Sequence, residues 1–169
     1  AIYNKKVKGK VVEKGVAIPV CISINECVCH NCPMDTDTEE ELLKDGDLVK
    51  IDLGVHVDGY IAAVAHTVNV GYVKPSEPVK GGLANCYAAA YCAAEVAAAM
   101  IRPGKTNTEV TNGIKKITEA YGVQSICGTL MHQVKRFVMD ANKMILLRDE
   151  PEQKVKECTF EANEVYVVD

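Results

Sequence analysis

The sequence predicts an α+β fold in which helices pack on one face of a mainly antiparallel sheet. Three observations lead to this prediction. Asp58-Gly59 separates two runs of alternating apolar residues, and Asp-Gly in such a place is a strong signal for a two-residue β-hairpin turn. The alanine-rich residues 83–101 favour a helix. A second helix is expected to begin at Thr106, because Glu109 completes a capping box three residues later.

The remaining elements follow in chain order. Residues 15–30 are rich in β-branched side chains and predict a strand, and residues 48–57 and 60–70 are the two strands of the hairpin. Residues 126–140 and 155–169 indicate further strands or mixed segments more weakly. The first helix is predicted to pack through a stripe of small and medium-sized side chains, which consists of Leu83, Tyr87, Ala90, Ala94, Ala97 and Ile101.

The composition is that of one ordinary globular domain. Of 169 residues, 48% are apolar and 25% are charged, which supplies a core and argues against disorder. No apolar run is long enough for a membrane helix and the start does not resemble a signal peptide, so we expect no membrane insertion. The first residue is not Met, and the last residues fall within a predicted strand. We therefore expect residues 1–169 to be a fragment of a longer chain.

Charge is spread unevenly around a formal net charge of −4. Residues 1–14 are basic and residues 35–47 are acidic. Most such runs are solvated surface, although a basic segment at the start of the chain can contact nucleic acid.

Eight cysteines without a secretion signal predict reduced thiols in a cytosolic or nuclear protein.

Four potential zinc ligands crowd together in the stretch CVCHNC, namely Cys27, Cys29, His30 and Cys32. A structural zinc site commonly needs a second pair of ligands with similar spacing, and none follows. In a continuous strand, Cys27 and Cys29 would share one face. Buried thiols are therefore the interpretation that we prefer over zinc.

The hairpin places a possible metal site on one sheet face. If Asp58 and Gly59 are the two loop residues, Asp52 pairs with Ala65, and Ala63 is its diagonal neighbour on the same face. Two carboxylates in these positions could share a pair of metal ions. Position 63 carries a methyl group, which donates no electron pair. His66 falls on the opposite face in this register and cannot replace the missing ligand.

Five stretches carry a resemblance that covers essentially the whole chain. In order, they are KGVAIPVCISINECVCH, GDLVKIDLGVHVDGYIAAVAHT, IRPGKTNTEV, MHQVKRFVMD and EANEVYVVD. Through them the chain resembles the proliferation-associated branch of the methionine-aminopeptidase-like, or pita-bread, family. The resemblance implies the pita-bread fold. It also implies that residues 1–169 are a single incomplete domain of this fold, which lacks the family's N-terminal region and its C-terminal strands and tail.

The active peptidases of this family hold two metal ions with two Asp, one His and two Glu, and two further histidines assist. Carried over by resemblance, the first Asp is Asp52 and the second is replaced by Ala63. His132 matches the ligand histidine, and Met131 beside it stands where the peptidases have glycine. Asp169 takes the place of the first Glu. Of the two helper histidines, one is matched by His30 and the other is replaced by Asp140. Each match has a structural alternative: Asp52 as a hydrogen-bonding group within the sheet, His132 as a satisfied core histidine, His30 as a packing residue and Asp169 as the end of an exposed strand.

The resemblance implies a protein without peptidase activity. Members of this branch regulate growth and associate with ribosomes, structured RNA and regulatory proteins, in the cytoplasm and in the nucleus or nucleolus. We expect no cofactor, while binding of one residual divalent ion stays open. The candidate phosphate contacts are Lys5, Lys6, Lys8, Lys10, Lys115, Lys116, Lys135 and Arg136.

Two other functions stay open at this point. The chain could belong to an active two-metal methionine aminopeptidase, which removes N-terminal Met. It could also be a structural core without a site of its own.

Overall fold

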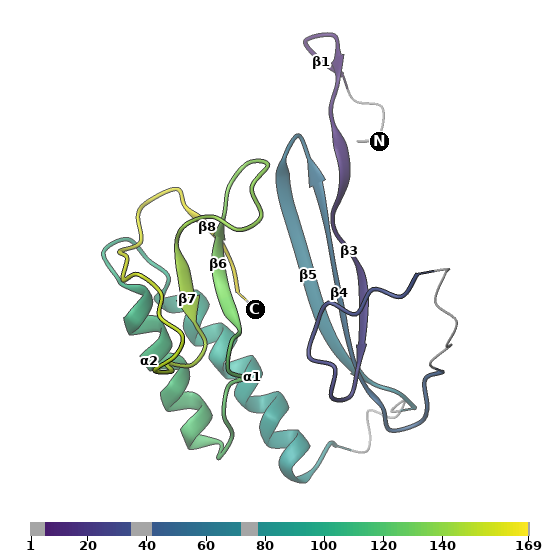
Figure 1. The fold of residues 1–169 in the computed structure, drawn as a ribbon, viewed down its shortest axis with the longest axis vertical. Coiled ribbons are helices and arrows are strands. Elements are labelled where there is room, and N and C mark those ends of the chain that lie inside the picture. The colour runs from purple at the N-terminus through teal and green to yellow at the C-terminus, as the bar shows by residue number, and fades with distance from the viewer. Residues whose placement is uncertain (1–5, 35–41, 72–77, 169) are drawn as a thin grey trace. The chain divides into compact units, whose positions relative to one another are not determined.

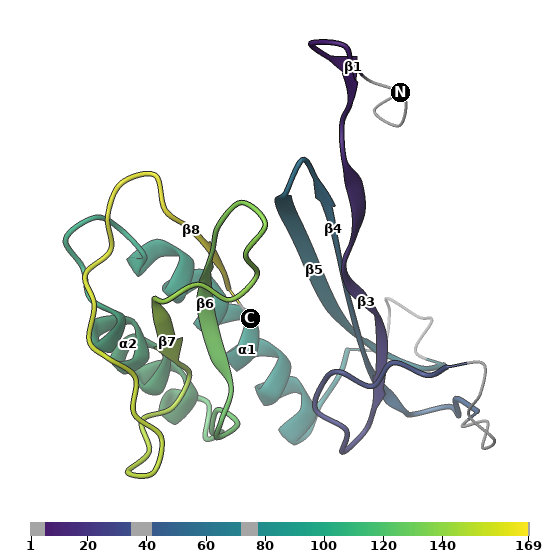
Figure 2. The same cartoon turned by 45° about the horizontal axis from the view of Figure 1, so that its top comes forward.

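The computed structural model describes residues 6–34, 42–71 and 78–168. The chain divides into two compact units, Ala1–Ser76 and Glu77–Asp169. Antiparallel strands and two helices make up the described elements (Figures 1 and 2), which confirms the α+β class. That residues 1–169 form one incomplete domain stays a prediction. Within the described ranges, neither helix is long and apolar enough to cross a membrane.

The first unit contains two antiparallel sheets. A two-stranded ribbon, β1-β2, leads into a three-stranded sheet with the order β3-β4-β5. The ribbon extends past the Asp58-Gly59 turn of the larger sheet (Figures 1 and 2). The bounds are Lys6–Val7 for β1, Lys10–Val11 for β2, Lys14–Ile24 for β3, Leu48–Val57 for β4 and Tyr60–Asn69 for β5.

The predicted hairpin between β4 and β5 is confirmed. Asp58 and Gly59 both have positive φ, 53° and 80°, which is the type I′ geometry that matches the twist of the flanking strands. The amide of Gly59 also donates a hydrogen bond to Nδ1 of His56 at 3.3 Å. A two-residue loop fixes the register of the whole hairpin, and therefore the face on which each side chain lies.

The strand predicted over residues 15–30 was too long, because β3 ends at Ile24. Asn25 adopts a positive φ of 48°, which turns the chain out of the sheet. Its side chain replaces the lost strand contacts. Nδ2 donates to Oδ1 of Asp47 at 2.9 Å, and Oδ1 accepts from the amide of Leu48 at 2.9 Å. Residues 26–34 consequently form a loop rather than the end of a strand.

The second unit consists of two helices and a three-stranded antiparallel sheet. The strand order is β7-β6-β8, and both helices lie against this sheet (Figure 1). The three-residue strand β7 was not predicted. The bounds are Gly81–Met100 for α1, Asn107–Ala120 for α2, Leu130–Val134 for β6, Met144–Leu146 for β7 and Val165–Val167 for β8.

Both predicted helices are present, and the capping box of α2 is complete. Oγ1 of Thr106 accepts from the amide of Glu109 at 3.2 Å, and a carboxylate oxygen of Glu109 accepts from the amide of Thr106 at 2.9 Å. The stripe predicted for α1 was partly wrong, since Ala90 is exposed. The buried residues of α1 are Ala89, Ala93 and Ala97.

The core of the second unit joins α1 and α2 to the sheet. Gly113 brings α2 close to α1, because a Cβ at this position would lie 2.6 Å from Sδ of Met100. The rings of Phe160 and Tyr166 meet edge to face with their centroids 5.2 Å apart. The buried members of this core are Ala93, Ala97, Val110, Ile114, Met131, Ile145 and Phe160.

Candidate functional site

Asp52 lies in the middle of β4, and pairing with β5 decides which side chains share its face. Asp52 pairs with Ala65, and Gly54 pairs with Ala63. Directly paired residues point to the same face, and so do alternate residues along one strand. Ala63 is therefore the diagonal neighbour of Asp52, as the hairpin register predicted. His66 lies on the opposite face of the sheet.

The residues on the Asp52 face do not fit the two-metal centre of the peptidases. Such a centre needs ligands for two ions roughly 3.5–4 Å apart. Around Asp52, the hairpin places the hydrogen atoms of Gly54 and the methyl groups of Ala63 and Ala65. None of these groups donates an electron pair. Where a shared pair of ions needs two carboxylates, this region of the hairpin offers one.

A β-bulge in β3 brings Cys21 to Asp52. Ile18 pairs with Gly54 and Cys21 pairs with Asp52, so three steps along β3 correspond to two along β4. Pro19 lies inside this irregularity, where its missing N–H removes no ladder hydrogen bond. Cys21 is only 3% exposed, and its thiol donates to the carbonyl of Pro19 at 3.5 Å. The bulge therefore puts Cys21 on the same face as Asp52.

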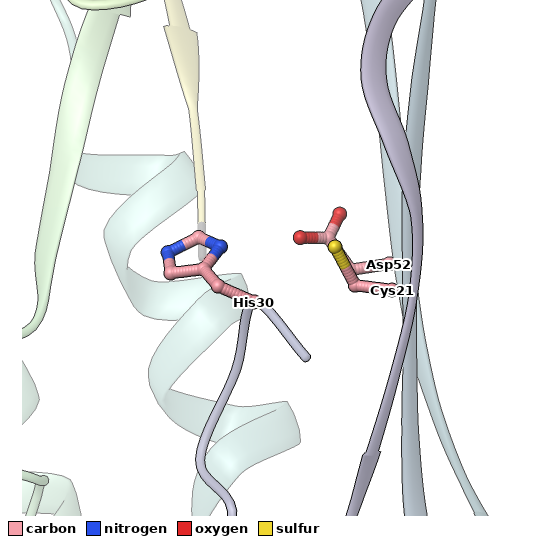
Figure 3. Close-up of side chains that lie close together, drawn as sticks. All are labelled: Cys21, His30 and Asp52. Carbon is pink, nitrogen blue, oxygen red and sulfur yellow. The ribbon is translucent and has the colours of Figure 1, made fainter. Parts of the chain in front are cut away.

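The loop after β3 folds back and adds His30 to this pair. Hydrogen bonds of Asn31 hold the loop against β3. Its carbonyl accepts from the amide of Ile22 at 2.7 Å, and its Nδ2 donates to the Ile22 carbonyl at 2.8 Å. The amide of Asn31 donates to Oγ of Ser23 at 3.2 Å. His30 has a positive φ of 64°, and one nitrogen of its ring faces the side chains of Asp52 and Cys21 (Figure 3).

Cys21, His30 and Asp52 form a compact set of three different ligand types. One ligand atom from each lies within 4.8 Å of the others, and within residues 6–34, 42–71 and 78–168 no other group of three His, Cys, Asp or Glu side chains converges in this way. Cys21 is buried, Asp52 is half-buried and His30 is exposed. The set therefore sits at the surface of the sheet, with the imidazole as its outer member.

The electrostatics of this set disfavour a reactive cysteine. Burial, followed by the negative charge of Asp52, raises the pKa of the Cys21 thiol above its ordinary value. Catalytic cysteines have a lowered pKa, because a neighbouring positive charge or a helix N-terminus stabilises the thiolate. The arrangement thus does not resemble a Cys–His nucleophile, although thiol, imidazole and carboxylate are all able to ligate a metal ion.

Sequence reasoning matched Asp52 and His30 to a family site but missed Cys21. The one available signal was Pro19, because proline inside a strand indicates a bulge, and a bulge changes which residues face each other.

The other cysteines of the CVCHNC stretch lie in the loop, so the prediction of buried thiols was wrong. Cys27, Cys29 and Cys32 are all exposed. Since the strand ends at Ile24, the alternation that would have buried them does not continue. Unlike these cysteines, His30 lies close to Cys21 and Asp52 on the sheet.

The remaining matched positions belong to the second unit. His132 lies on β6, and its Nδ1 is 3.4 Å from Oδ1 of Asp140. This separation is within ion-pair range, but its geometry does not make a hydrogen bond, and Nδ1 is buried. Met131, beside it, is part of the core, which the peptidases' glycine could not fill in the same way. Asp169 lies outside the described residues.

The basic candidates lie on separate elements. Lys5 lies outside the described residues. Lys115 forms a long ion pair of 3.9 Å with Glu119 on the same helix. Their role in binding stays a prediction. The exposed positions are Lys6, Lys8 and Lys10 on the β1-β2 ribbon, Lys115 and Lys116 on α2, and Lys135 and Arg136 directly after β6.

Comparison with curated proteins gives close matches along nearly the whole chain. Proliferation-associated protein A of Dictyostelium discoideum is 49% identical over 96% of this chain and 41% of its own length. ErbB-3 binding protein 1 of Solanum tuberosum is 47% identical over 98% of this chain and 41% of its own length. The resemblance to the proliferation-associated branch is thus confirmed. The chain spans about two fifths of the length of these relatives.

A solved structure and a family description both match this chain. The structure of methionine aminopeptidase from Rickettsia prowazekii matches with a TM-score of 0.68 and 24% identity, over 87% of this chain and 53% of that one. This match confirms the pita-bread fold. The description of metallopeptidase family M24 matches residues 1–168. The chain therefore belongs to the M24 metallopeptidase family, within which its sequence is similar to the proliferation-associated proteins.

Proposed function

We propose that this chain is part of a non-enzymatic aminopeptidase homologue that binds ribosomes or structured RNA and regulatory proteins in growth and translation. The observation that carries the proposal is the methyl group of Ala63 on the Asp52 face of the hairpin. A peptidase of this family needs a carboxylate there to hold its second ion. Changing a group that only orients a ligand already costs about 10- to 100-fold in metal affinity, and loss of a ligand itself should cost more.

Two further positions support the same conclusion. Asp140 stands where the peptidases have a helper histidine, and it faces His132 at 3.4 Å. Met131 replaces a glycine and fills the core with its side chain. Both changes fall at positions that the peptidase mechanism uses. We infer that the fold has been kept while its two-metal chemistry has been lost.

The name of a relative and the charge of the β1-β2 ribbon support the binding role. One relative is named for binding ErbB-3, a protein partner. The projecting β1-β2 ribbon presents Lys6, Lys8 and Lys10 to solvent, which suits contact with phosphate groups. A net charge of −4 does not favour strong nonspecific binding by these 169 residues alone. We place the protein in the cytoplasm and in the nucleus or nucleolus, where ribosomes are made and used.

RNA affinity measured against salt concentration tests the binding role. Each phosphate contact adds about 0.7–0.9 to the slope of log affinity against log salt. In the full-length protein, replacing Lys6, Lys8 and Lys10 together by Gln should lower the magnitude of this slope by roughly 2–3. The matched control replaces Lys154 and Lys156, which are also exposed, and should leave the slope unchanged. RNA binding without a salt-dependent slope would count against the proposal.

The second candidate is the active methionine aminopeptidase. It is favoured by four matches, at Asp52, His132, His30 and Asp169, the last of which lies outside the described residues. It is opposed by Ala63, Asp140 and Met131. With Ala63, the two metal ions of the peptidases would lose a ligand. Turnover of a methionyl peptide with added Co²⁺ or Mn²⁺ would decide in its favour.

A further inference from the structure

We propose that Cys21, His30 and Asp52 bind one Zn²⁺ ion, through the thiolate sulfur, an imidazole nitrogen and a carboxylate oxygen. The site shares Asp52 with the two-metal centre of the peptidases and has none of its other ligands. Bound there, the ion would fasten the loop after β3 to strands β3 and β4. The inference goes beyond the proposed function, since it requires neither RNA nor a protein partner.

The spacing of the three ligand atoms is close to that of a tetrahedral zinc site. Zinc bonds of roughly 2.0–2.3 Å place tetrahedral ligands roughly 3.3–3.8 Å apart. The three ligand atoms lie within 4.8 Å of one another, so no pair needs to approach by more than about 1.5 Å. His30 is exposed and can supply this movement by rotating its side chain. Three protein ligands leave the fourth position to water.

The backbone holds the ligands in place before any ion binds. Cys21 and Asp52 occupy directly paired positions on neighbouring strands. His30 precedes Asn31, whose hydrogen bonds to Ile22 and Ser23 fix the loop against β3. Because Cys21, Asp52 and the backbone at His30 are already ordered, the His30 side chain is the main group that loses conformational freedom on binding. Surface side chains that are close only by chance would not be held by strand pairing and loop hydrogen bonds in this way.

The ligand types select zinc over the harder divalent ions. Mg²⁺ and Ca²⁺ prefer oxygen ligands, whereas sulfur and imidazole ligands suit Zn²⁺. The thiolate and the carboxylate together balance the two positive charges of the ion. When the zinc–sulfur bond forms, the proton of the Cys21 thiol is released to solvent. The bound site is therefore neutral, with the half-buried Asp52 carboxylate paired to a cation.

Titration of the full-length protein with Co²⁺, followed by competition with Zn²⁺, tests the proposal. A thiolate ligand gives cobalt a near-ultraviolet charge-transfer band, which is independent of any enzymatic activity. We expect one equivalent of Co²⁺ to produce this band in the wild type, and Zn²⁺ to abolish it. Zn²⁺ should also raise the thermal unfolding temperature, because it binds the folded state.

Three variants separate this site from the CVCHNC stretch. Cys21→Ser should remove the band, and Asp52→Asn should weaken cobalt binding at least about 10-fold. Cys27→Ser, a change in the exposed loop outside the proposed site, should keep both the band and the affinity. Circular dichroism checks that each variant folds, and Asp52→Asn keeps the test decisive should Cys21→Ser fail to fold.

Two outcomes would overturn the proposal. One is a folded wild-type protein that gives no charge-transfer band. The other is a band that survives Cys21→Ser and Asp52→Asn but disappears in Cys27→Ser, which would assign the metal to the cysteine-rich loop. Neither outcome depends on whether the protein binds RNA or hydrolyses peptides, so failure here and failure of the proposed function can be told apart.

Discussion

Replacing Asn107 by Ala should strongly destabilise the second unit. Asn107 is the first residue of α2 and is 1% exposed. Its Nδ2 donates to the carbonyls of Met144 and Lys156 at 2.9 and 3.0 Å, and its Oδ1 accepts from the amide of Cys158 at 3.0 Å. One side chain thus joins α2 to β7 and to the segment before Phe160. All three hydrogen bonds are lost in Asn107→Ala, together with the one that Oδ1 accepts from the amide of Thr108 at 3.0 Å.

The size of the effect is worked from the three hydrogen bonds to residues outside α2. Each hydrogen bond to a buried backbone group contributes about 1–1.5 kcal/mol, so the free energy of unfolding should fall by roughly 3–4 kcal/mol. Urea denaturation of the full-length protein, followed by circular dichroism, measures this change. The control is Asn112→Ala, an exposed position on the same helix, which should change stability by less than about 0.5 kcal/mol. A loss below about 1 kcal/mol in Asn107→Ala would refute the reasoning.

Two further changes probe the sheet and the ion pairs. Gly54→Ala would place a Cβ 2.9 Å from Cγ1 of Ile18, and it should lower the free energy of unfolding, measured by urea denaturation, by about 1–3 kcal/mol. In the control Gly82→Ala, the new Cβ has nothing within 4 Å, so the change should stabilise α1 by up to about 1 kcal/mol. Equal effects of the two changes would contradict the close contact between Gly54 and Ile18. Burial by itself raises the pKa of Glu164, but hydrogen bonds, foremost from Lys143 at 2.7 Å, outweigh it and lower the pKa below its ordinary value of 4.5. The resulting stability is present above pH 4.5 and lost as the pH falls through the lowered pKa, so Glu164→Gln should flatten the acid limb of the stability curve; an unchanged limb would show that the carboxylate contributes nothing.

Local signals were enough to predict the hairpin and the second helix. Asp58-Gly59 specifies a type I′ turn through its own backbone preferences, and the turn then sets the register that places Ala63 beside Asp52. Thr106 and Glu109 cap α2 through contacts only three residues apart. In each case the information lies within a few neighbouring residues.

The end of β3 and the third member of the candidate site depend on distant contacts. Asn25 leaves the sheet because its side chain bonds to Asp47 and Leu48, which are more than twenty residues away. Cys21 faces Asp52 only because of a bulge whose position is set by pairing with β4. Neither contact can be found from the spacing of residues along the chain.

The packing of α1 could not be predicted for a different reason. Alanine occupies so much of this helix that hydrophobic spacing does not distinguish one face from another. The buried residues are Ala89, Ala93 and Ala97, and the last two pack in the core that joins α1 to α2 and to the sheet.

Hydrolysis of a methionyl peptide by the full-length protein, with Co²⁺ or Mn²⁺ added, tests most directly whether two-metal chemistry has been lost. We predict no release of methionine above that of the peptide and metal alone, because the methyl group of Ala63 cannot hold the second ion. Mass spectrometry of the products measures the release. Metal-dependent release that Asp52→Asn abolishes would contradict this conclusion, since it would show that a working two-metal centre forms without a carboxylate at position 63.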